Sequence, residues 1–369
     1  MGRNLVLCLD GTSNEPEADT TNVARIFEAA AKDETQLVYY DPGVGTMGAR
    51  GAVTALGKRA TRAAGLVAGF GVKDNIEEAY TWLMQRWQPD DQIYLFGFSR
   101  GAYTARALAG MLRTVGLLRP GAENLVPYAL KLYAQAGKED PTDDEEKDFW
   151  RTRRGFTAKF GDPEFPHPFD STRKQVHFLG VWDTVKSVGW LNWKARVEQA
   201  RWPFTGSLPN VDIARHALAI DERRRPFPAY RFHTEVVAAS EGRFLEMWFA
   251  GVHSDVGGQF PDDHRLSDLA FLWLVDEAEK AGLTVESNAV HRLVGVRWNQ
   301  PLPENLHTGT VHRNPSTWML AGGWRGRRVL PGDHVHPSVQ LRIDAFAGSA
   351  TPYRPRLPSR LGTLAASGP

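Results

Sequence analysis

The residues with the clearest capacity for chemistry lie in the stretch GFSRG, Gly97 to Gly101. A serine between two glycines, after an apolar run and before an Ala-rich helical pattern, is typical of a nucleophile on a sharp strand-to-helix turn. The glycines are expected because a side chain at either position would collide with neighbouring backbone when the serine takes a strained conformation. The alternative is that Ser99 only caps the N-terminus of a buried helix. The strand before the turn and the helix after it favour the nucleophile.

A serine nucleophile needs a general base, and the base needs a carboxylate that orients it. In serine hydrolases with a strand–turn–helix nucleophile, the chain order is serine, acid, histidine. Here Ser99 is followed by Asp183, at the end of the run FLGVW, and by His253, at the end of MWFAGV. Both lie just beyond the carboxyl end of a predicted strand, the edge of an open α/β sheet where ligands bind. The sequence therefore predicts a triad of Ser99, His253 and Asp183.

Other residues compete for the roles of base and acid. Three histidines lack an equally clear position at a strand end: His216, His233 and His264. Asp255, two residues after His253, could be the acid or could brace the loop. Asp221, in AIDERRRPF, is expected to pair with a nearby arginine. Asp183 and His253 stay the preferred pair.

A second polar turn, Asp10-Gly11-Thr12, follows the first apolar run of the chain. Haloacid-dehalogenase phosphatases place a nucleophilic aspartate two residues before this D-G-T, but that position is Cys8 here, so a Mg²⁺-dependent phosphatase centred on Asp10 is the lesser alternative. We expect the backbone N–H groups of Gly11 and Arg100 to form an oxyanion hole, with Asp10 and Thr12 supporting the loop. The other interpretation is that Asp10 only stabilises a turn.

The sequence shows no spacing typical of a metal or nucleotide site. It has no H-E-x-x-H motif and a single cysteine, Cys8. We therefore expect neither a metal nor a cofactor. The 44 Lys and Arg residues nearly balance the 43 Asp and Glu residues, so the composition does not indicate a nucleic-acid partner. The sequence does not indicate an oligomeric state.

Strands and helices alternate along the chain. The apolar patterns predict strands at 5–9, 36–40, 92–97, 176–182 and 245–252, and helices at 73–87, 102–112 and 266–274. This alternation indicates an α/β fold, α/β-hydrolase-like, with a mostly parallel sheet flanked by helices.

The predicted organisation is a single domain over residues 1–345 and a C-terminal tail over 346–369. Three segments do not fit the alternation and are expected to form a cap over one end of the sheet: about 120–172, 186–210 and 300–345.

Three tryptophans lie in or near the second cap segment: Trp190, Trp193 and Trp202. They could belong to a lipid-facing lid and make a peripheral membrane contact, because tryptophan favours membrane interfaces. The alternative is that they pack the core of the cap. The sequence has no membrane-spanning stretch and no apolar run long enough for a secretory signal. We expect a cytoplasmic location, or export by a signal-independent secretion machine.

Several motifs occur together in the order of one family: LVLCLDGTSN, YYDPGVGT, YLFGFSRGAYTARALAGML, FLGVWDTVKSVG, HALAIDERRRPF and WFAGVHSDVGGQF. Over roughly residues 4–345 the chain resembles the uncharacterised α/β-hydrolase domain family whose best-understood members are type VI secretion phospholipase effectors. The resemblance implies a serine hydrolase acting on esters, with phospholipase A activity in the effector members. It implies Ser99 as nucleophile in GFSRG, Asp183 as acid in GVWDTV and His253 as base in GVHSDVGG.

We therefore expect a lipase, phospholipase or esterase that works through an acyl-enzyme on a small-molecule or lipid ester. The alternative from another class is a catalytically inactive hydrolase-fold module that binds a partner.

Overall fold

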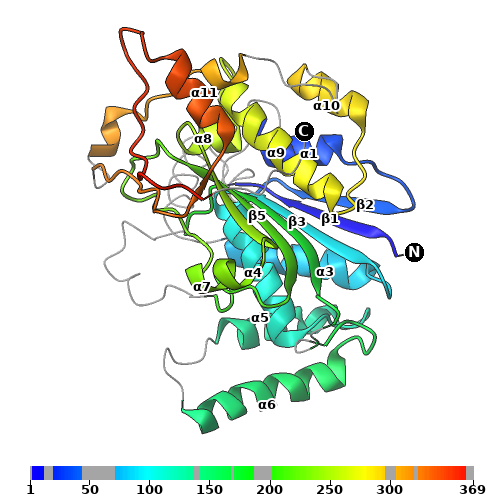
Figure 1. Ribbon diagram of the computed structural model, residues 1–369. Coiled ribbons are helices and arrows are strands. Elements are labelled where there is room, and N and C mark those ends of the chain that lie inside the picture. Colours follow the sequence, from blue (N-terminus) through cyan, green and yellow to red (C-terminus); the bar gives the residue numbers. More distant parts are fainter. Residues whose placement is uncertain are drawn as a thin grey trace, which may run out of the picture.

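The described part of the chain forms a seven-stranded sheet with helices on both faces (Figure 1). The computed structural model describes residues 2–11, 20–43, 71–135, 142–167, 170, 172–186, 202–295, 305–319 and 323–362. The strands are β1 (Asn4–Leu9), β2 (Gln36–Asp41), β3 (Gln92–Phe98), β4 (Val176–Trp182), β5 (Val211–Ala219), β6 (Phe244–Phe249) and β7 (His334–Val335). They pair in the order β2-β1-β3-β4-β5-β6-β7, and every pair is parallel. The predicted α/β class and parallel sheet are confirmed.

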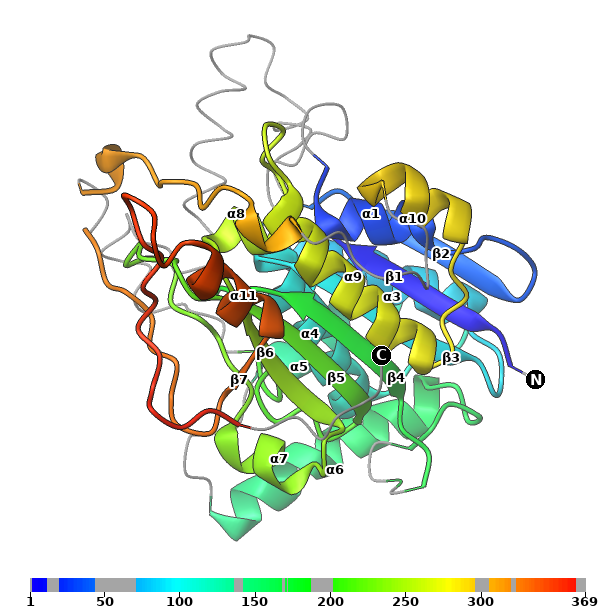
Figure 2. The same ribbon diagram turned by 45° about the horizontal axis from the view of Figure 1, so that its top comes forward.

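The helices cover the sheet in two layers (Figures 1 and 2). One layer contains α3 (Val72–Arg86), α4 (Arg100–Val115), α5 (Val126–Ala134), α6 (Asp143–Phe160) and α7 (Thr234–Ala239). The other contains α1 (Asn22–Ala29), α8 (His253–Gly257), α9 (Arg265–Lys280), α10 (Ser287–Val294) and α11 (Pro337–Ala345). Short 3₁₀ turns complete the described elements: η1 (Glu123–Leu125), η3 (Leu306–Thr308) and η4 (Ser316–Met319).

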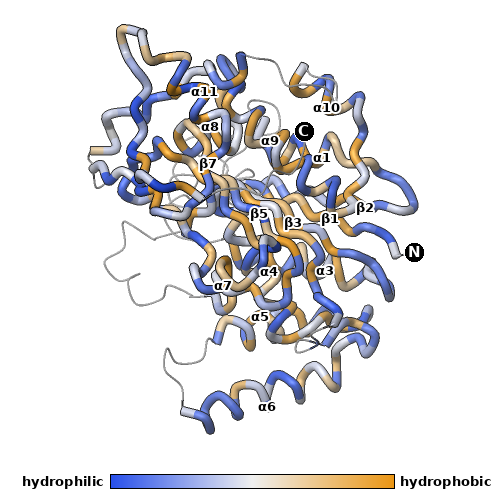
Figure 3. The backbone as a smooth tube through the Cα atoms, viewed as in Figure 1, coloured by the Kyte–Doolittle hydropathy of each residue, from blue (hydrophilic) through white to orange (hydrophobic). Residues whose placement is uncertain are grey.

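The strand β1, which lies between β2 and β3, shows how the sheet joins the two layers. Leu5, Leu7 and Leu9 belong to the apolar cluster under α3 and α4, whereas Val6 and Cys8 belong to the cluster under α1 and α9. All five side chains are fully buried, which explains why this strand is a continuous apolar run in the sequence. Figure 3 shows the same pattern, with apolar residues along the strands and hydrophilic residues on outer elements such as α6.

The register of the strands brings their carboxyl ends to one edge. Leu9 of β1 pairs with Gly97 of β3, and Phe98 of β3 pairs with Trp182 of β4. The polar residues that follow these strands must therefore lie close together. From β1 the chain runs to β2 on one side of β1, and it then continues to β3 on the other side of β1. Open α/β sheets bind ligands at such a switch in strand order.

The strands and helices predicted from apolar periodicity are present, with shifts of a few residues at their ends. β5 and β7 were not predicted. β5 carries Arg215 and His216 on positions that a simple apolar pattern would reject. Tertiary contacts explain them, because Arg215 pairs with Glu277 of α9 and His216 pairs with Glu246 of β6.

The segment expected at about 120–172 as part of a cap contributes mainly to one helical layer. Thr157 of α6 donates to the carbonyl of Val115 at 2.9 Å, and Arg153 donates to the carbonyl of Gln135 at 2.7 Å. α5 and α6 thus lie on the outer side of α4, away from the carboxyl ends of the strands (Figure 1). The expected division of the chain into domain, cap and tail stays a prediction.

Parts of the other expected segments are visible in the structure. Trp190 and Trp193 lie outside the described residues, while Trp202 stacks on Tyr133 of α5 with ring centroids 5.1 Å apart. In the expected tail, Tyr353 and Leu357 pack on the apolar cluster around Trp248. Among the helices of the described ranges, none has the length and apolar character needed to cross a bilayer.

Candidate active site

Ser99 lies at the junction between β3 and α4, in a backbone conformation that side-chain-bearing residues rarely adopt. Its φ is 58° and its ψ is −118°, and its side chain makes no capping hydrogen bond to the helix. Its Oγ lies 2.8 Å from Nε2 of His253 instead. A strained backbone that directs a serine at a histidine supports the nucleophile interpretation and not the helix cap.

The two glycines beside Ser99 make this turn sterically feasible. A Cβ on Gly97 would lie 2.6 Å from the carbonyl oxygen of Gly101, and a Cβ on Gly101 would lie 2.1 Å from that of Leu9. Both distances are far below van der Waals contact. The first turn of α4 therefore touches the end of β1 directly, as the sequence predicted for glycine at these positions.

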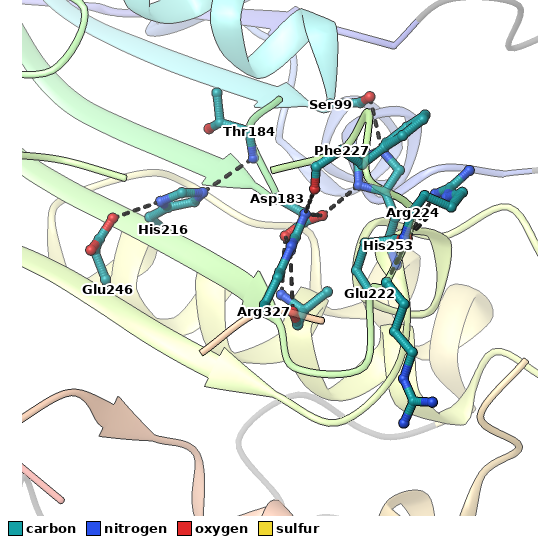
Figure 4. Close-up of polar contacts among 12 residues, drawn as sticks. Ser99, Asp183, Thr184, His216, Glu222, Arg224, Phe227, Glu246, His253 and Arg327 are labelled. Carbon is teal, nitrogen blue, oxygen red and sulfur yellow. Dashed lines mark hydrogen bonds and ion pairs between the residues drawn. The ribbon is translucent and has the colours of Figure 1, made fainter. Parts of the chain in front are cut away.

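His253 and Asp183 complete a continuous chain of hydrogen bonds with Ser99 (Figure 4). His253 opens α8 just beyond β6, and Asp183 follows β4 directly. Nδ1 of His253 lies 2.5 Å from Oδ2 of Asp183. Because an ionised carboxylate only accepts, Nδ1 carries the proton and Nε2 is left to accept from the Ser99 hydroxyl. The structure thus brings together the three residues that the sequence suggested.

Arg327 is a site residue that the sequence did not indicate. Its Nη1 contacts Oδ1 of Asp183, its Nη2 lies 3.0 Å from Oδ2, and it also donates to the carbonyls of Ala219 and Phe227. The side chain is 5% exposed and that of Asp183 is fully buried. Arg327 lies in WRGRR, where three arginines occur without helical or strand periodicity, so no local signal distinguishes it.

The charge of Asp183 is set by two opposing effects. Burial alone would raise the pKa of this carboxyl, but Arg327 and the hydrogen bond from His253 reverse the effect and hold the pKa well below its usual range. The amide of Ala219 adds a third donor, 3.0 Å from Oδ1. The acid is therefore ionised throughout the range in which a histidine base works.

The imidazole of His253 is enclosed by aromatic rings and by a second ion pair. The rings of Phe98 and Phe227 lie with their centroids 4.6 Å and 5.2 Å from it. Burial lowers the pKa of His253, Asp183 opposes this effect, and the nearby Arg224 adds to it. Glu222 pairs with Arg224 and also accepts from the backbone N–H of His253 at 3.2 Å. At neutral pH the imidazole is consequently uncharged and able to accept a proton.

Asp255 and Asp221, the competing carboxylates, have other partners. Asp255 accepts from the amide of Val252 at 2.8 Å and from Nδ1 of His312 at 2.5 Å, so it braces the start of α8. Asp221 accepts from the amide of Gly251 and the hydroxyl of Tyr353, each at 2.8 Å. In this segment Glu222 forms the ion pair, with Arg224, whereas Asp221 is attracted to Arg342 and Arg223.

The competing histidines are also placed elsewhere. His216 lies within β5, fully buried, with Nδ1 3.0 Å from Oε1 of Glu246 and Nε2 accepting from the amide of Thr184 at 3.2 Å (Figure 4). Burial lowers its pKa, against the effect of Glu246. His233 precedes α7 and His264 precedes α9, each at the amino end of a helix.

In the turn after β1, one of the two backbone N–H groups expected to form an oxyanion hole has another partner. Asp10 accepts from the amide of Gly11 at 2.6 Å, from the hydroxyl of Tyr40 at 2.9 Å and from that of Thr21. The Gly11 N–H that we expected in an oxyanion hole is thus engaged by Asp10. Thr12 lies outside the described residues. Arg100 is the first residue of α4, and the first amides of a helix have no intrahelical acceptor.

The chemistry of this arrangement is that of a serine, a base and an acid at the carboxyl edge of a sheet. In the described ranges no cluster of three or more His, Cys, Asp or Glu side chains is placed to hold a metal ion. Asp10, the centre of the phosphatase alternative, is buried and accepts from Gly11 of its own turn, from Tyr40 of β2 and from Thr21 before α1.

Comparison with known proteins relates most of the chain to one group. The family model described as "T6SS, Phospholipase effector Tle1-like, catalytic domain" matches residues 3–277. This range contains Ser99, Asp183 and His253, whereas Arg327 lies beyond it. The uncharacterized protein YEL023C of Saccharomyces cerevisiae is 33% identical over 235 residues, which are 61% of this chain and 32% of that protein. The chain thus spans about a third of that relative's length.

Two solved structures are similar at 18% sequence identity. An uncharacterized protein from Pseudomonas aeruginosa is matched over 78% of this chain and 47% of that chain, with a TM-score of 0.41. The Tle1 effector bound to the VgrG spike from the Type 6 secretion system is matched over 71% of this chain and 52% of that chain, with a TM-score of 0.38. Because the family model covers well over half of the sequence, the chain belongs to the family of type VI secretion Tle1-like phospholipase effector catalytic domains.

Proposed function

We propose that the chain is a serine hydrolase that cleaves the carboxylic ester of a lipid, with a phospholipid as its first candidate substrate. The observation that carries the proposal is the chain of contacts from Ser99 Oγ to His253 Nε2 at 2.8 Å and from His253 Nδ1 to Asp183 Oδ2 at 2.5 Å. The family to which the chain belongs is one of phospholipase effectors, which supports a lipid substrate.

The proposed reaction is acyl transfer to water. His253 Nε2 takes the proton of the Ser99 hydroxyl while Oγ attacks the ester carbonyl carbon, and the carbonyl oxygen becomes an oxyanion. The N–H of Arg100, at the positive end of α4, is the proposed donor to this oxyanion. The tetrahedral intermediate collapses, His253 gives its proton to the leaving alcohol, and the acyl group stays on Ser99. Water, deprotonated by His253, then releases the fatty acid and restores the serine.

Asp183 and Arg327 are proposed to act on the base and not on the substrate. Asp183 holds the Nδ1–H tautomer of His253 and stabilises the imidazolium that forms in each step. Arg327 holds both oxygens of Asp183 and keeps the carboxylate ionised in a buried place. Without this cation the buried carboxylate would be favoured in its protonated form, which cannot accept from Nδ1–H.

A partner-binding module without catalysis is the second candidate from the sequence. It is less well supported, because a binding role alone does not require a serine with a φ of 58° aligned with a histidine and a buried carboxylate.

The test is covalent labelling of the serine together with a screen of substrates. The protein is treated with a fluorophosphonate, and the modified peptide is located by mass spectrometry. Wild type, Ser99→Ala and Ser254→Ala are then compared on p-nitrophenyl esters of several chain lengths and on phospholipids. We expect the adduct on Ser99 and a loss in kcat of about ten-thousandfold or more in Ser99→Ala.

Ser254 is the matched control, since it is adjacent to His253 in the chain but donates to Gln259 at 3.0 Å. Its variant should keep the activity of the wild type. Folded wild-type protein that neither reacts at Ser99 nor turns over any ester would overturn the proposal and favour the binding module.

A further inference from the structure

Two segments beside the active site bring exposed arginines together. Residues 223–225 and 323–325 run antiparallel around an isolated bridge between Arg224 and Trp324. The amide of Arg325 donates to the carbonyl of Arg223 at 2.6 Å, and the amide of Arg225 donates to that of Gly323 at 3.1 Å. Arg223 and Arg325 therefore occupy opposed positions on neighbouring chain segments.

We call five residues of these segments and their neighbours the arginine surface: Arg223, Arg225, Arg313, Arg325 and Arg328. All five are exposed, and none forms an ion pair with any residue that the structure describes. Arg313 precedes Asn314, which donates to Glu222 at 3.2 Å, and Arg328 follows Arg327. The arginine surface thus adjoins the residues that hold the triad.

The arginine surface places like charges close together. Arg223 and Arg325 lie at opposed positions of paired chain segments and repel each other, and the attraction between Arg223 and Asp221 offsets only part of this repulsion. The net charge of the whole chain is only +1, so this concentration is not a consequence of a generally basic composition. Arg224, between two of these residues, is different because it pairs with Glu222. An external anion would remove the repulsion.

Exposed apolar side chains lie next to these charges. Met319 is 63% exposed and Trp324 is 41% exposed. Trp318, adjacent to Met319, packs edge-on against Phe227 at 5.4 Å, and Phe227 packs edge-on against His253 at 5.2 Å. The orange segment that holds η4 lies at the margin of the molecule on the side toward which the strands run (Figures 1 and 2). One aromatic path therefore connects the surface to the catalytic base.

We propose that the arginine surface, with Trp324 and Met319, docks the protein on the anionic headgroups of a phospholipid bilayer. Arginines near such a surface are attracted to its negative potential, and tryptophan partitions to the level of the headgroups. A nucleic acid would satisfy the arginines but would leave Met319 exposed and would not require proximity to His253. The inference rests on the proposed lipid ester hydrolysis, and it identifies the face that meets the substrate.

The test is vesicle binding by co-sedimentation. The double variant Arg223→Glu/Arg325→Glu is compared with wild type on phosphatidylcholine vesicles with and without phosphatidylglycerol, at low and high salt. A control of equal charge change, Lys147→Glu/Arg151→Glu, lies on α6, where both side chains are more than 70% exposed. In Figure 1, α6 lies on the outer side of its helical layer, away from the carboxyl ends of the strands. Hydrolysis of a soluble p-nitrophenyl ester is measured for each protein as a readout of the active site.

We expect the double variant to bind anionic vesicles about tenfold or more weakly than wild type, while its hydrolysis of the soluble ester is unchanged. The α6 control should bind as wild type does, and Trp324→Ala should weaken binding to both kinds of vesicle. Equal binding by wild type and the double variant, an equal loss in the α6 control, or wild-type retention by duplex DNA without retention by vesicles would overturn the inference. A wild type that binds vesicles through the arginine surface but does not react at Ser99 would instead contradict the proposed function alone.

Discussion

At the scale of single residues, the protonation of His253 is set by its burial and by the charges around it. Burial favours the uncharged imidazole, the Asp183 carboxylate raises the proton affinity of His253, and Arg224 lowers it. The balance lowers the pKa of His253 below its ordinary value of 6.5. Since the base must be uncharged to accept the serine proton, we expect the acidic limb of kcat/KM to lie below pH 6.5.

The variant Arg327→Met tests whether Arg327 keeps the Asp183 carboxylate ionised. Loss of the cation leaves the charge of Asp183 uncompensated, which raises the pKa of His253, and burial then favours protonated Asp183. Both effects move the acidic limb to higher pH, by about one unit, and lower kcat/KM at pH 7 by about tenfold or more. KM for a soluble ester should change little, because Arg327 contacts Asp183 and not the substrate. Arg327→Lys keeps the positive charge. Its acidic limb and its kcat/KM at pH 7 should therefore lie between those of Arg327→Met and wild type.

Arg342→Met is the matched control for the loss of a buried arginine. Arg342 donates to the carbonyls of His307 and Gly309 at 2.7 Å and 2.6 Å and does not contact the triad. Its loss should lower Tm without moving the pH profile. If Arg327→Met lowers Tm in the same way and keeps the wild-type acidic limb, Arg327 only anchors its segment.

At the scale of elements, the site depends on how closely α4 begins against β1. α4 is rich in alanine and buries nearly its whole surface, and it is followed by Gly116, whose φ is 67°. Its start is held by backbone contact and not by a side-chain cap. The position of Ser99 is therefore set by the absence of side chains at Gly97 and Gly101.

Gly101→Ala and Gly155→Ala separate helix propensity from this close approach. Alanine is favoured over glycine inside a helix by about 0.5–1 kcal/mol. At Gly155 of α6, where a Cβ would meet nothing within 4 Å, we expect a gain in the free energy of unfolding of that size. At Gly101 the new Cβ would lie 2.1 Å from the Leu9 carbonyl oxygen, so we expect a loss of more than about 1 kcal/mol, together with lower kcat. Urea unfolding measures both, and a stabilised Gly101→Ala protein would contradict the account of the turn.

At the scale of the whole molecule, a buried polar network connects the sheet to the C-terminal segment. Glu246 of β6 lies between His216 and Arg231, and Arg231 also pairs with Asp333 just before β7. His216 in turn accepts from the amide of Thr184, the residue after Asp183. The strands under the acid and the segment that carries Arg327 are therefore linked through ionisable groups.

This network predicts a loss of stability in mild acid. Burial lowers the pKa of His216 in the folded protein, so below about pH 6.5 the unfolded chain binds a proton that the folded chain does not. The free energy of unfolding should then fall as the pH decreases from about 6.5. His216→Gln should be less stable at neutral pH but should show a flatter dependence on pH in this range, as measured by urea midpoints. His291→Gln, on the exposed side of α10, is the control and should keep the wild-type slope.

The order of elements and the positions of the three proposed catalytic residues could be predicted from the sequence for a physical reason. Buried parallel strands are apolar runs, and their carboxyl ends share one edge, so a residue just after such a run has a predictable place. Ser99, Asp183 and His253 are such residues. β5 was missed because its arginine and histidine are accommodated only by partners on other elements, Glu277 and Glu246.

The partners of the site residues were decided only by the tertiary structure. Arg327 lies 144 positions from Asp183 in the chain, in a segment without periodicity, and nothing local relates the two. The same holds for Asp255, which pairs with His312, 57 positions away in the chain. The sequence by itself determined which residues reach the edge of the sheet, because strand periodicity is local. Which charges surround them there, and hence their protonation and orientation, depended on packing between distant segments.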